Sequence, residues 1–174
     1  MLLKFRFCVW NMLNSIANIL FNKIPVHVEV VDPIYYEYPP KYETDGSAGV
    51  DLRACIEEES IHIYPGEVVK VSSGLKIAIP EGYVGLLAVR SGKSTKGGLR
   101  TANQLAIIDS DYRGIVHIAC CTHNPEGCKI ERGERIAQIL FSPVHQATFI
   151  PCCDVAKEYP TARGARGFGH TGEK

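Results

Sequence analysis

Two carboxylates, Asp109 and Asp111, stand in one short acidic cluster, with Asn103 before it and Tyr112 directly after it. A carboxylate can hold and polarise a water molecule, and an Asn amide can both donate to and accept from the edge of a nucleobase. The ring of Tyr112 offers a flat face to a sugar. An ordinary acidic turn between two core strands explains the same residues, so the rest of the chain must decide between a reaction site and a plain turn.

The residues on either side of this cluster predict the two arms of a β-hairpin. Leu105–Ile108 is an apolar run that leads into the turn, and Ile115–Ala119 alternates after it with His117 as its polar member. Period-two alternation around a tight acidic turn is typical of a hairpin. We therefore expect Asp109 at the crest of a hairpin.

From Ile24 onward the sequence is typical of an all-β protein. Many short strands separated by Pro and Gly turns, without a long helical pattern, predict one antiparallel sandwich or barrel, with at most one short helix near Ser91–Lys96. Valines at 26, 28 and 30 predict the first strand. The further strand candidates are Val50–Ala54, Ile61–Ile63, Glu67–Val71, Leu75–Ile79, Val84–Val89, Leu105–Ile108, Ile115–Ala119, Ile136–Phe141 and Ala147–Ile150.

The bulk composition excludes several classes of protein. Lys plus Arg equals Asp plus Glu at 19 each, whereas a general nucleic-acid binder has a large basic excess. Seven irregularly spaced Cys indicate a reducing intracellular compartment rather than a disulfide scaffold. A zinc site built from Cys120, Cys121, His123 and Cys128 is disfavoured because adjacent residues of a strand point to opposite faces.

Residues 1–23 differ from the rest of the chain. They are rich in apolar residues and Asn, and Leu13, Ile16 and Leu20 fit one face of a short amphipathic helix. The segment is too polar for a membrane span and lacks a clean signal-cleavage site. It is interpreted as an extension or an upstream start with Met12 as a second candidate, with a targeting segment or an oligomer contact as alternatives.

Several residues are suited to binding a phosphate chain. Arg90-Ser91-Gly92 offers a cation, a hydroxyl and close approach to the backbone, and a helix that begins here would add free N–H groups. Gln138 is a polar side chain within an apolar strand and needs a partner. The alternatives are a surface turn with an ion pair for the first group and a backbone contact for Gln138. A P-loop is excluded because Leu87 stands where its first glycine belongs.

Five stretches in order resemble the five motifs of the trimeric dUTP pyrophosphatase (dUTPase) family, and the resemblance covers about Ile24 to Gly172. They are Ser47–Ala54, Arg90–Gly92 leading into Lys96–Gly98, Asn103–Gly114, Gly133–Gln138 and Arg163–Gly172. The resemblance implies a jelly-roll-like β-barrel that forms a homotrimer. It divides the chain into an N-terminal extension (1–23), the barrel (24–159) and a glycine-rich lid over the active site (160–174).

The same resemblance implies a role for each site residue. Asp109 is the catalytic carboxylate that activates water, and Asp51 supports Mg²⁺ through water, with a turn-capping role as its alternative. The substrate-binding residues are Arg90, Ser91, Gly92 and Gln138 at the phosphates, Asn103 and Tyr112 at the nucleoside, and Arg163, Phe168 and Gly169 in the lid. The lid is expected to come from a neighbouring subunit.

The implied activity is hydrolysis of dUTP to dUMP and pyrophosphate, which limits uracil incorporation into DNA and supplies dUMP for dTMP synthesis. We expect an intracellular enzyme, cytoplasmic or nuclear, with no nucleic-acid or membrane partner. One alternative is a dCTP deaminase, disfavoured because Ala119 stands where that family has its catalytic Glu. The other is a non-catalytic trimeric regulator that binds dUTP and signals to a partner.

Overall fold

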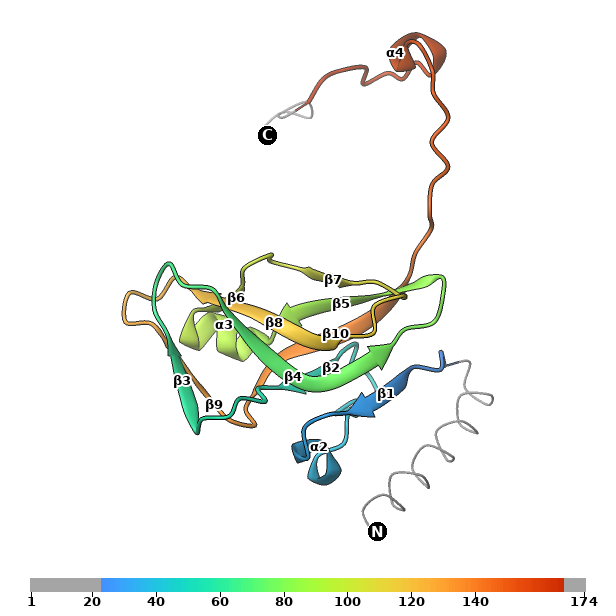
Figure 1. Cartoon of the computed structure of the whole chain (residues 1–174). Helices are drawn as coiled ribbons and strands as arrows, with labels where there is room; N and C mark the ends of the chain where they lie inside the picture. Colours follow the sequence, from blue (N-terminus) through green and yellow to red (C-terminus); the bar gives the residue numbers. More distant parts are fainter. Residues whose placement is uncertain (1–22, 168–174) are drawn as a thin grey trace. The chain divides into compact units, whose positions relative to one another are not determined.

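The computed structural model describes residues 23–167, so the expectations for residues 1–22 lie outside the described part of the chain. The chain divides into two compact units, with the boundary between Val144 and His145. The first unit holds all the described strands (Figure 1). No helix of the described residues is long and apolar enough to cross a membrane.

The described secondary structure is mostly β. The strands are β1 (His27–Val30), β2 (Val50–Arg53), β3 (Ser60–Ile63), β4 (Val69–Ala78), β5 (Tyr83–Val89), β6 (Leu99–Thr101), β7 (Ala106–Ile108), β8 (Ile115–Thr122), β9 (Cys128–Glu131) and β10 (Arg135–Pro143). The helices are α2 (Ile34–Glu37), α3 (Ser91–Gly97) and α4 (Val155–Glu158).

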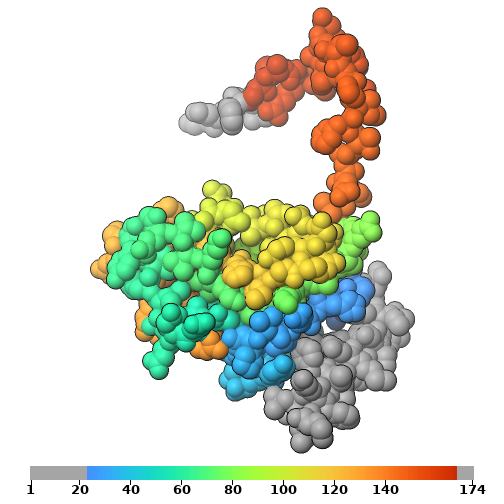
Figure 2. Space-filling model, viewed as in Figure 1, coloured from blue at the N-terminus to red at the C-terminus, as the bar shows by residue number. Residues whose placement is uncertain are grey.

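These strands form three antiparallel sheets. One sheet has the order β1-β4-β8-β6, the second has the order β2-β10-β5-β7, and β3 pairs with β9. The all-β prediction is therefore confirmed. Within the described residues no strand pairing joins the sheets into a closed barrel. Figure 2 shows the side chains of β1 and α2 (blue) directly against those of the green segments that follow.

The predicted hairpin around Asp109 is wrong. β7 pairs with β5, whereas β8 pairs with β4 and β6, so the strands on either side of the acidic turn belong to different sheets. Alternation predicts that a segment is a strand but does not name its partner. The turn at Asp109 thus carries the chain from one sheet to the other.

Other differences from the prediction have local causes. The two strands predicted at 67–71 and 75–79 form one strand, β4, because Gly74 at φ +69° lets it continue through an irregularity. The short strands β6 and β9 escaped prediction, and Ala147–Ile150 forms no strand in this chain. The predicted helix at Ser91 is confirmed as α3, and the single turns α2 and α4 add to it.

The core of the first unit lies between its sheets. Its fully buried large side chains are Tyr35, Leu52, Ile63, Leu75, Leu87, Leu99, Ile118, Ile130, Ile136 and Ile139. The hydroxyl of Tyr35 accepts a hydrogen bond from the backbone N–H of Arg53 (2.9 Å), and burial raises the pKa of Tyr35. The described cysteines are free thiols, and burial raises the pKa of Cys55 and of Cys120 to about 12. Cys120 is therefore a core side chain, and the partly buried Cys55 packs against the core.

Gly74 should be far less tolerant of a side chain than Gly66. Both have positive φ, which costs an alanine about 1–2 kcal/mol. A methyl group on Gly74 would lie 2.6 Å from Asp32 Cβ and from Cys55 Sγ, whereas one on Gly66 meets nothing within 4 Å. We expect Gly74→Ala to lower the free energy of unfolding by about 2–5 kcal/mol, and Gly66→Ala by about 1–2 kcal/mol. Urea denaturation of both variants measures the difference, and equal losses would contradict the crowding around Gly74.

Candidate active site

A cationic cavity of about 350 Å³ opens where β5 ends and α3 begins. Its lining residues are Arg90, Ser91, Gly92, Lys93, Glu134 and Arg135. Ser91 and Gly92 are exposed, and no side chain caps the first turn of α3. Unsatisfied N–H groups at a helix start attract anions. We call this cavity the phosphate pocket, since its donors suit a phosphate chain.

Carboxylates hold the cations of the phosphate pocket in place. Asp51 binds Arg90 Nε at 3.1 Å and Arg135 Nη1 at 3.2 Å, and its side chain is 15% exposed. Glu43 binds the same Arg135 nitrogen at 3.2 Å. Lys93 Nζ lies 2.7 Å from Glu134 Oε1. The pocket therefore presents guanidinium groups that are already oriented before any ligand arrives.

Sequence reasoning did not single out all of these residues. Arg135 and Glu134 belong to the fourth motif-like stretch, but only Gln138 was selected from it. Glu43 reaches Arg135 from the loop before β2, across 92 positions of sequence. No local pattern marks such a contact, because it depends on the register of β2 against β10.

Gln138 lies beside the phosphate pocket. In the paired register it stands opposite Asp51 on β2 and opposite Ala88 on β5, so the three residues share one face of the sheet. Its side chain is half-buried and makes no hydrogen bond within the described part of the chain. The carboxamide is thus a polar group still able to bind a ligand.

The acidic turn presents its side chains to solvent. Asp109 and Tyr112 are exposed, and the backbone N–H of Tyr112 donates to Asp109 O at 3.2 Å. The Tyr112 hydroxyl donates to Ile115 O at 2.9 Å, which fixes the ring. Within residues 23–167 the Asp109 carboxylate has no hydrogen-bond partner. It is therefore free to hold a water molecule.

Asn103 lies at the other end of β7 from Asp109. It is exposed, in the short turn that joins β6 to β7, and Leu105 N donates to its carbonyl oxygen at 2.7 Å. The adjacent Gln104 has φ +59°, the left-handed backbone of a tight turn. The turn thus keeps the Asn103 amide at the surface.

One chain does not bring Asp109 to the phosphate pocket. Ile108 pairs with Gly85 near the start of β5, whereas Arg90 follows Val89 at its end. A strand advances about 3.3 Å per residue, so the five steps from Gly85 to Arg90 span about 17 Å. Attack on phosphorus needs contact distances of about 3–3.5 Å. Within one chain, the backbone beside the predicted catalytic carboxylate therefore lies about 17 Å from the first of the predicted phosphate ligands.

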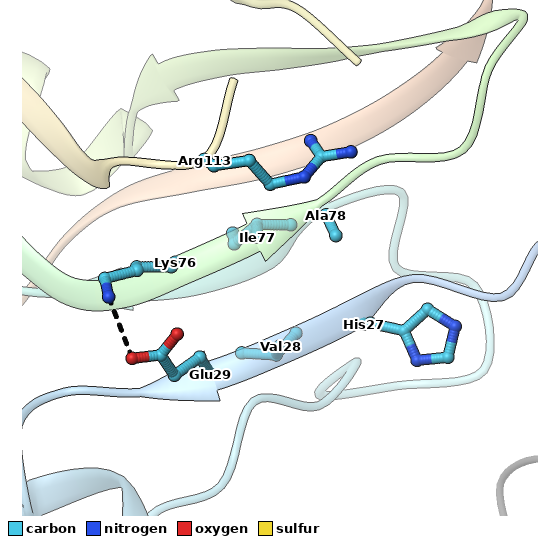
Figure 3. Close-up of a pocket in the computed structure, with 7 residues that line it drawn as sticks. All are labelled: His27, Val28, Glu29, Lys76, Ile77, Ala78 and Arg113. Carbon is cyan, nitrogen blue, oxygen red and sulfur yellow. Dashed lines mark hydrogen bonds and ion pairs between the residues drawn. The ribbon is translucent and has the colours of Figure 1, made fainter. Parts of the chain in front are cut away.

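A second cavity, of about 300 Å³, lies along β1 and β4 (Figure 3). Its charged groups are already engaged, since Lys76 Nζ binds Glu29 at 2.9 Å, and Arg113 Nη1 donates to Ser110 O and Tyr112 O. Arg113 thereby binds two backbone carbonyl oxygens of the acidic turn. Its side chain, which also lines this cavity, therefore helps to hold the turn.

Of the predicted lid residues, the structure describes Arg163, which belongs to the second unit. Arg163 Nε donates to Arg166 O at 2.8 Å, and its Nη2 donates to Gly167 O at 3.3 Å. Phe168 and Gly169 lie outside the described residues. No group of three or more metal-ligating side chains occurs among residues 23–167, so the one carboxylate predicted near a metal, Asp51, would act alone.

The dUTPase family model matches residues 37–172. The chain belongs to the dUTPase family. It is 40% identical over 152 residues to the deoxyuridine 5'-triphosphate nucleotidohydrolase of Psychromonas ingrahamii, covering 85% of this chain and 97% of that one. It is 42% identical over 153 residues to the enzyme of the same name from Acinetobacter baumannii, covering 86% and 99%.

Solved structures agree with this assignment. The dUTPase of Staphylococcus bacteriophage 80alpha with bound dUPNHPP superposes with a TM-score of 0.73 and 25% identity, covering 86% of this chain and 99% of that chain. This dUTPase family member therefore shares its fold with a solved dUTPase.

Asp51 should matter more to stability than Glu43, although both bind Arg135. Removing Asp51 leaves two half-buried guanidinium groups without their shared acceptor, and we expect Asp51→Ala to cost about 1–3 kcal/mol. Glu43 is exposed, so Glu43→Ala should cost less than about 0.5 kcal/mol. Guanidinium denaturation compares the two variants. A loss for Glu43→Ala that matches the loss for Asp51→Ala would contradict the central position of Asp51.

Proposed function

We propose that the protein hydrolyses dUTP to dUMP and pyrophosphate at sites assembled between copies of the chain. The observation that carries this proposal is an exposed, unpaired Asp109 carboxylate in the same fold as a preorganised cationic pocket. Membership of the dUTPase family and the names of the bacterial relatives support the same substrate.

The triphosphate binds in the phosphate pocket. Arg90 and Arg135 neutralise its charge, Ser91 and the backbone at Gly92 donate to its oxygens, and Gln138 adds a neutral donor. The guanidinium groups are held by Asp51 before binding. Because their orientation is set in advance, less conformational entropy is lost when the ligand arrives.

Asp109 activates the attacking water. Its carboxylate accepts a proton as the water oxygen bonds to the α-phosphorus, and the bond from that phosphorus to the bridging oxygen of pyrophosphate breaks. The products are dUMP and pyrophosphate. The free carboxylate oxygens of Asp109 support this role, since a carboxylate tied to a cation would be a weaker base.

The nucleoside is selected by Asn103 and Tyr112. The Asn103 amide matches the donor and acceptor edge of uracil. The Tyr112 ring lies against deoxyribose, where a 2′-hydroxyl would clash, and its tether to Ile115 keeps the ring in place. In the closed lid Phe168 stacks on uracil, while Arg163 and Gly169 bind the outer phosphates and help to exclude water.

Mg²⁺ fits this site as an ion carried by the substrate. It prefers phosphate oxygens and waters, with few protein ligands, and supplies charge neutralisation when bound. Both Asp51 oxygens already bind guanidinium groups. Asp51 therefore suits contact with the ion through water rather than direct coordination.

A homotrimer completes the site. The outer face of the second sheet carries Leu86 opposite Leu140, and the neighbouring Ile107 is 55% exposed. This apolar face lies next to Gln138 and suits burial against another copy. Closed symmetry would bring Asp109 of one copy to the phosphate pocket of the next. Each copy would be the jelly-roll-like barrel that the family resemblance implies.

In the cell, this activity would limit uracil in DNA and supply dUMP for dTMP synthesis. We place the enzyme in the cytoplasm or nucleus, without a nucleic-acid or membrane partner. The domain division at residues 23 and 160 is part of the same proposal, with residues 160–174 as the lid.

Asp109→Asn should abolish most turnover, because an amide cannot accept the proton from water. We expect kcat for dUTP to fall by about 10²–10⁴-fold, with a smaller change in KM. Asp111→Asn is the matched control, since it removes a carboxylate from the same turn and should retain most activity. Pyrophosphate release measures both, and full activity of Asp109→Asn would refute its assignment.

Two inactive variants should restore activity when they assemble together. One carries Asp109→Asn and the other carries Ser91→Ala with Gln138→Ala. In a cyclic trimer of both variants, an intact Asp109 meets an intact phosphate pocket at one site in three, so about a third of wild-type activity should return in the purified mixed assemblies.

The control for this experiment co-expresses the first variant with a triple variant that also carries Asp109→Asn, which can form no intact site. Differently tagged chains allow mixed assemblies to be purified. A mixed assembly that stays as inactive as the control would contradict sites shared between chains.

A further inference from the structure

Gly49 lies directly against the side chain of Gln138. It precedes β2 and shares a face with Asp51, because alternate residues of an extended chain point the same way. Asp51 is the register partner of Gln138 on β10. A methyl group on Gly49 would lie 2.9 Å from Gln138 Oε1, 3.3 Å from its Cβ and 3.5 Å from its Cδ. The carboxamide therefore fills the space that a side chain at position 49 would take.

The oxygen end of the carboxamide is the end nearer to position 49. The three nearest atoms include Oε1 but not Nε2, so the carbonyl oxygen lies toward Gly49 and the NH₂ group lies away from it. No side-chain hydrogen bond fixes this orientation within the described residues. The space that Gly49 leaves open is thus occupied by the oxygen end of the carboxamide.

This orientation is the useful one for an anion. Phosphate oxygens accept hydrogen bonds, so the NH₂ group must face the ligand and the carbonyl oxygen must face elsewhere. Gln138 on β10 stands directly opposite Asp51 on β2. The Asp51 carboxylate binds the two arginines of the phosphate pocket. A rotated carboxamide would present an oxygen to the phosphates instead.

We propose that Gly49 is a positioning residue for the substrate, which by lacking a side chain keeps the NH₂ group of Gln138 available to a phosphate oxygen. The proposal rests on the proposed function of the phosphate pocket. Gly49 touches Gln138 and acts through it.

The backbone does not require a glycine at this position. Gly49 is absent from the glycines with positive φ, so an alanine fits its backbone conformation. The closest crowded atom is the far end of a flexible side chain, which can move aside. Gly49→Ala should therefore displace the carboxamide at little cost to the fold, which separates a positioning role from a structural one.

Gly46→Ala is the matched control for Gly49→Ala. Gly46 lies in the same loop, also lacks a positive φ, and a methyl group there meets nothing within 4 Å. Binding of the non-hydrolysable analogue dUpNHpp is measured by calorimetry, beside KM and kcat for dUTP. We expect Gly49→Ala to raise Kd and KM about tenfold, because one hydrogen bond to a charged phosphate group is lost. The change in kcat should be smaller. Gly46→Ala should bind as the wild type does.

A double-variant cycle tests whether Gly49 acts through Gln138. Gln138→Ala should weaken analogue binding, and adding Gly49→Ala to it should cause no further loss, because no carboxamide remains to displace. Losses that add, or wild-type binding by Gly49→Ala, would overturn the proposal while leaving the proposed function intact. A wild-type protein that neither binds the analogue nor hydrolyses dUTP would overturn both.

Discussion

The pairing of β7 with the start of β5 is the constraint on which the rest of this protein depends. It keeps the acidic turn at one end of the sheet, while the chain leaves the other end of β5 into Arg90 and α3. The carboxylate suited to activating water and the pocket suited to phosphate are thereby separated within each copy. Under the proposed function, hydrolysis therefore requires a second copy, and assembly is part of the chemistry.

Ion pairs, rather than close apolar contacts, hold the cationic side chains of the phosphate pocket in position. Asp51 binds the guanidinium group of Arg90, which follows β5, and that of Arg135 on β10, and Lys93 is bound by Glu134. Such pairs contribute little to stability when exposed, but they fix the direction in which each cation points. Gln138 makes no hydrogen bond within residues 23–167, and Gly49 leaves room for its carboxamide. The cationic donors are thus held by ion pairs, whereas the neutral donor depends on the space left by a glycine.

Strand positions and motif residues could be read from the sequence because they depend on local pattern. Val28 and Val30 of the predicted first strand lie in β1, and the run at Ile136–Phe141 lies in β10, as predicted. Strand partners could not be read in this way. The hairpin expected around Asp109 failed because Ile107 and Ile108 pair with β5, which is distant in sequence.

The same limit applies to the site. Asp51 and Gln138 were found as separate residues of separate motifs, yet their adjacency follows only from the β2–β10 register. Glu43 carries no motif and became visible only through its contact with Arg135. The continuity of β4 depended on one glycine backbone angle, which composition does not reveal.

A crystal structure of the assembled protein with dUpNHpp and Mg²⁺ tests the central claim most directly. The account predicts that the Asp109 carboxylate of one copy holds a water in line with the α-phosphorus, while Ser91 and Arg90 of another copy bind the phosphates. An analogue held by Asp109 and Ser91 of the same chain, or an α-phosphorus remote from every Asp109, would contradict it.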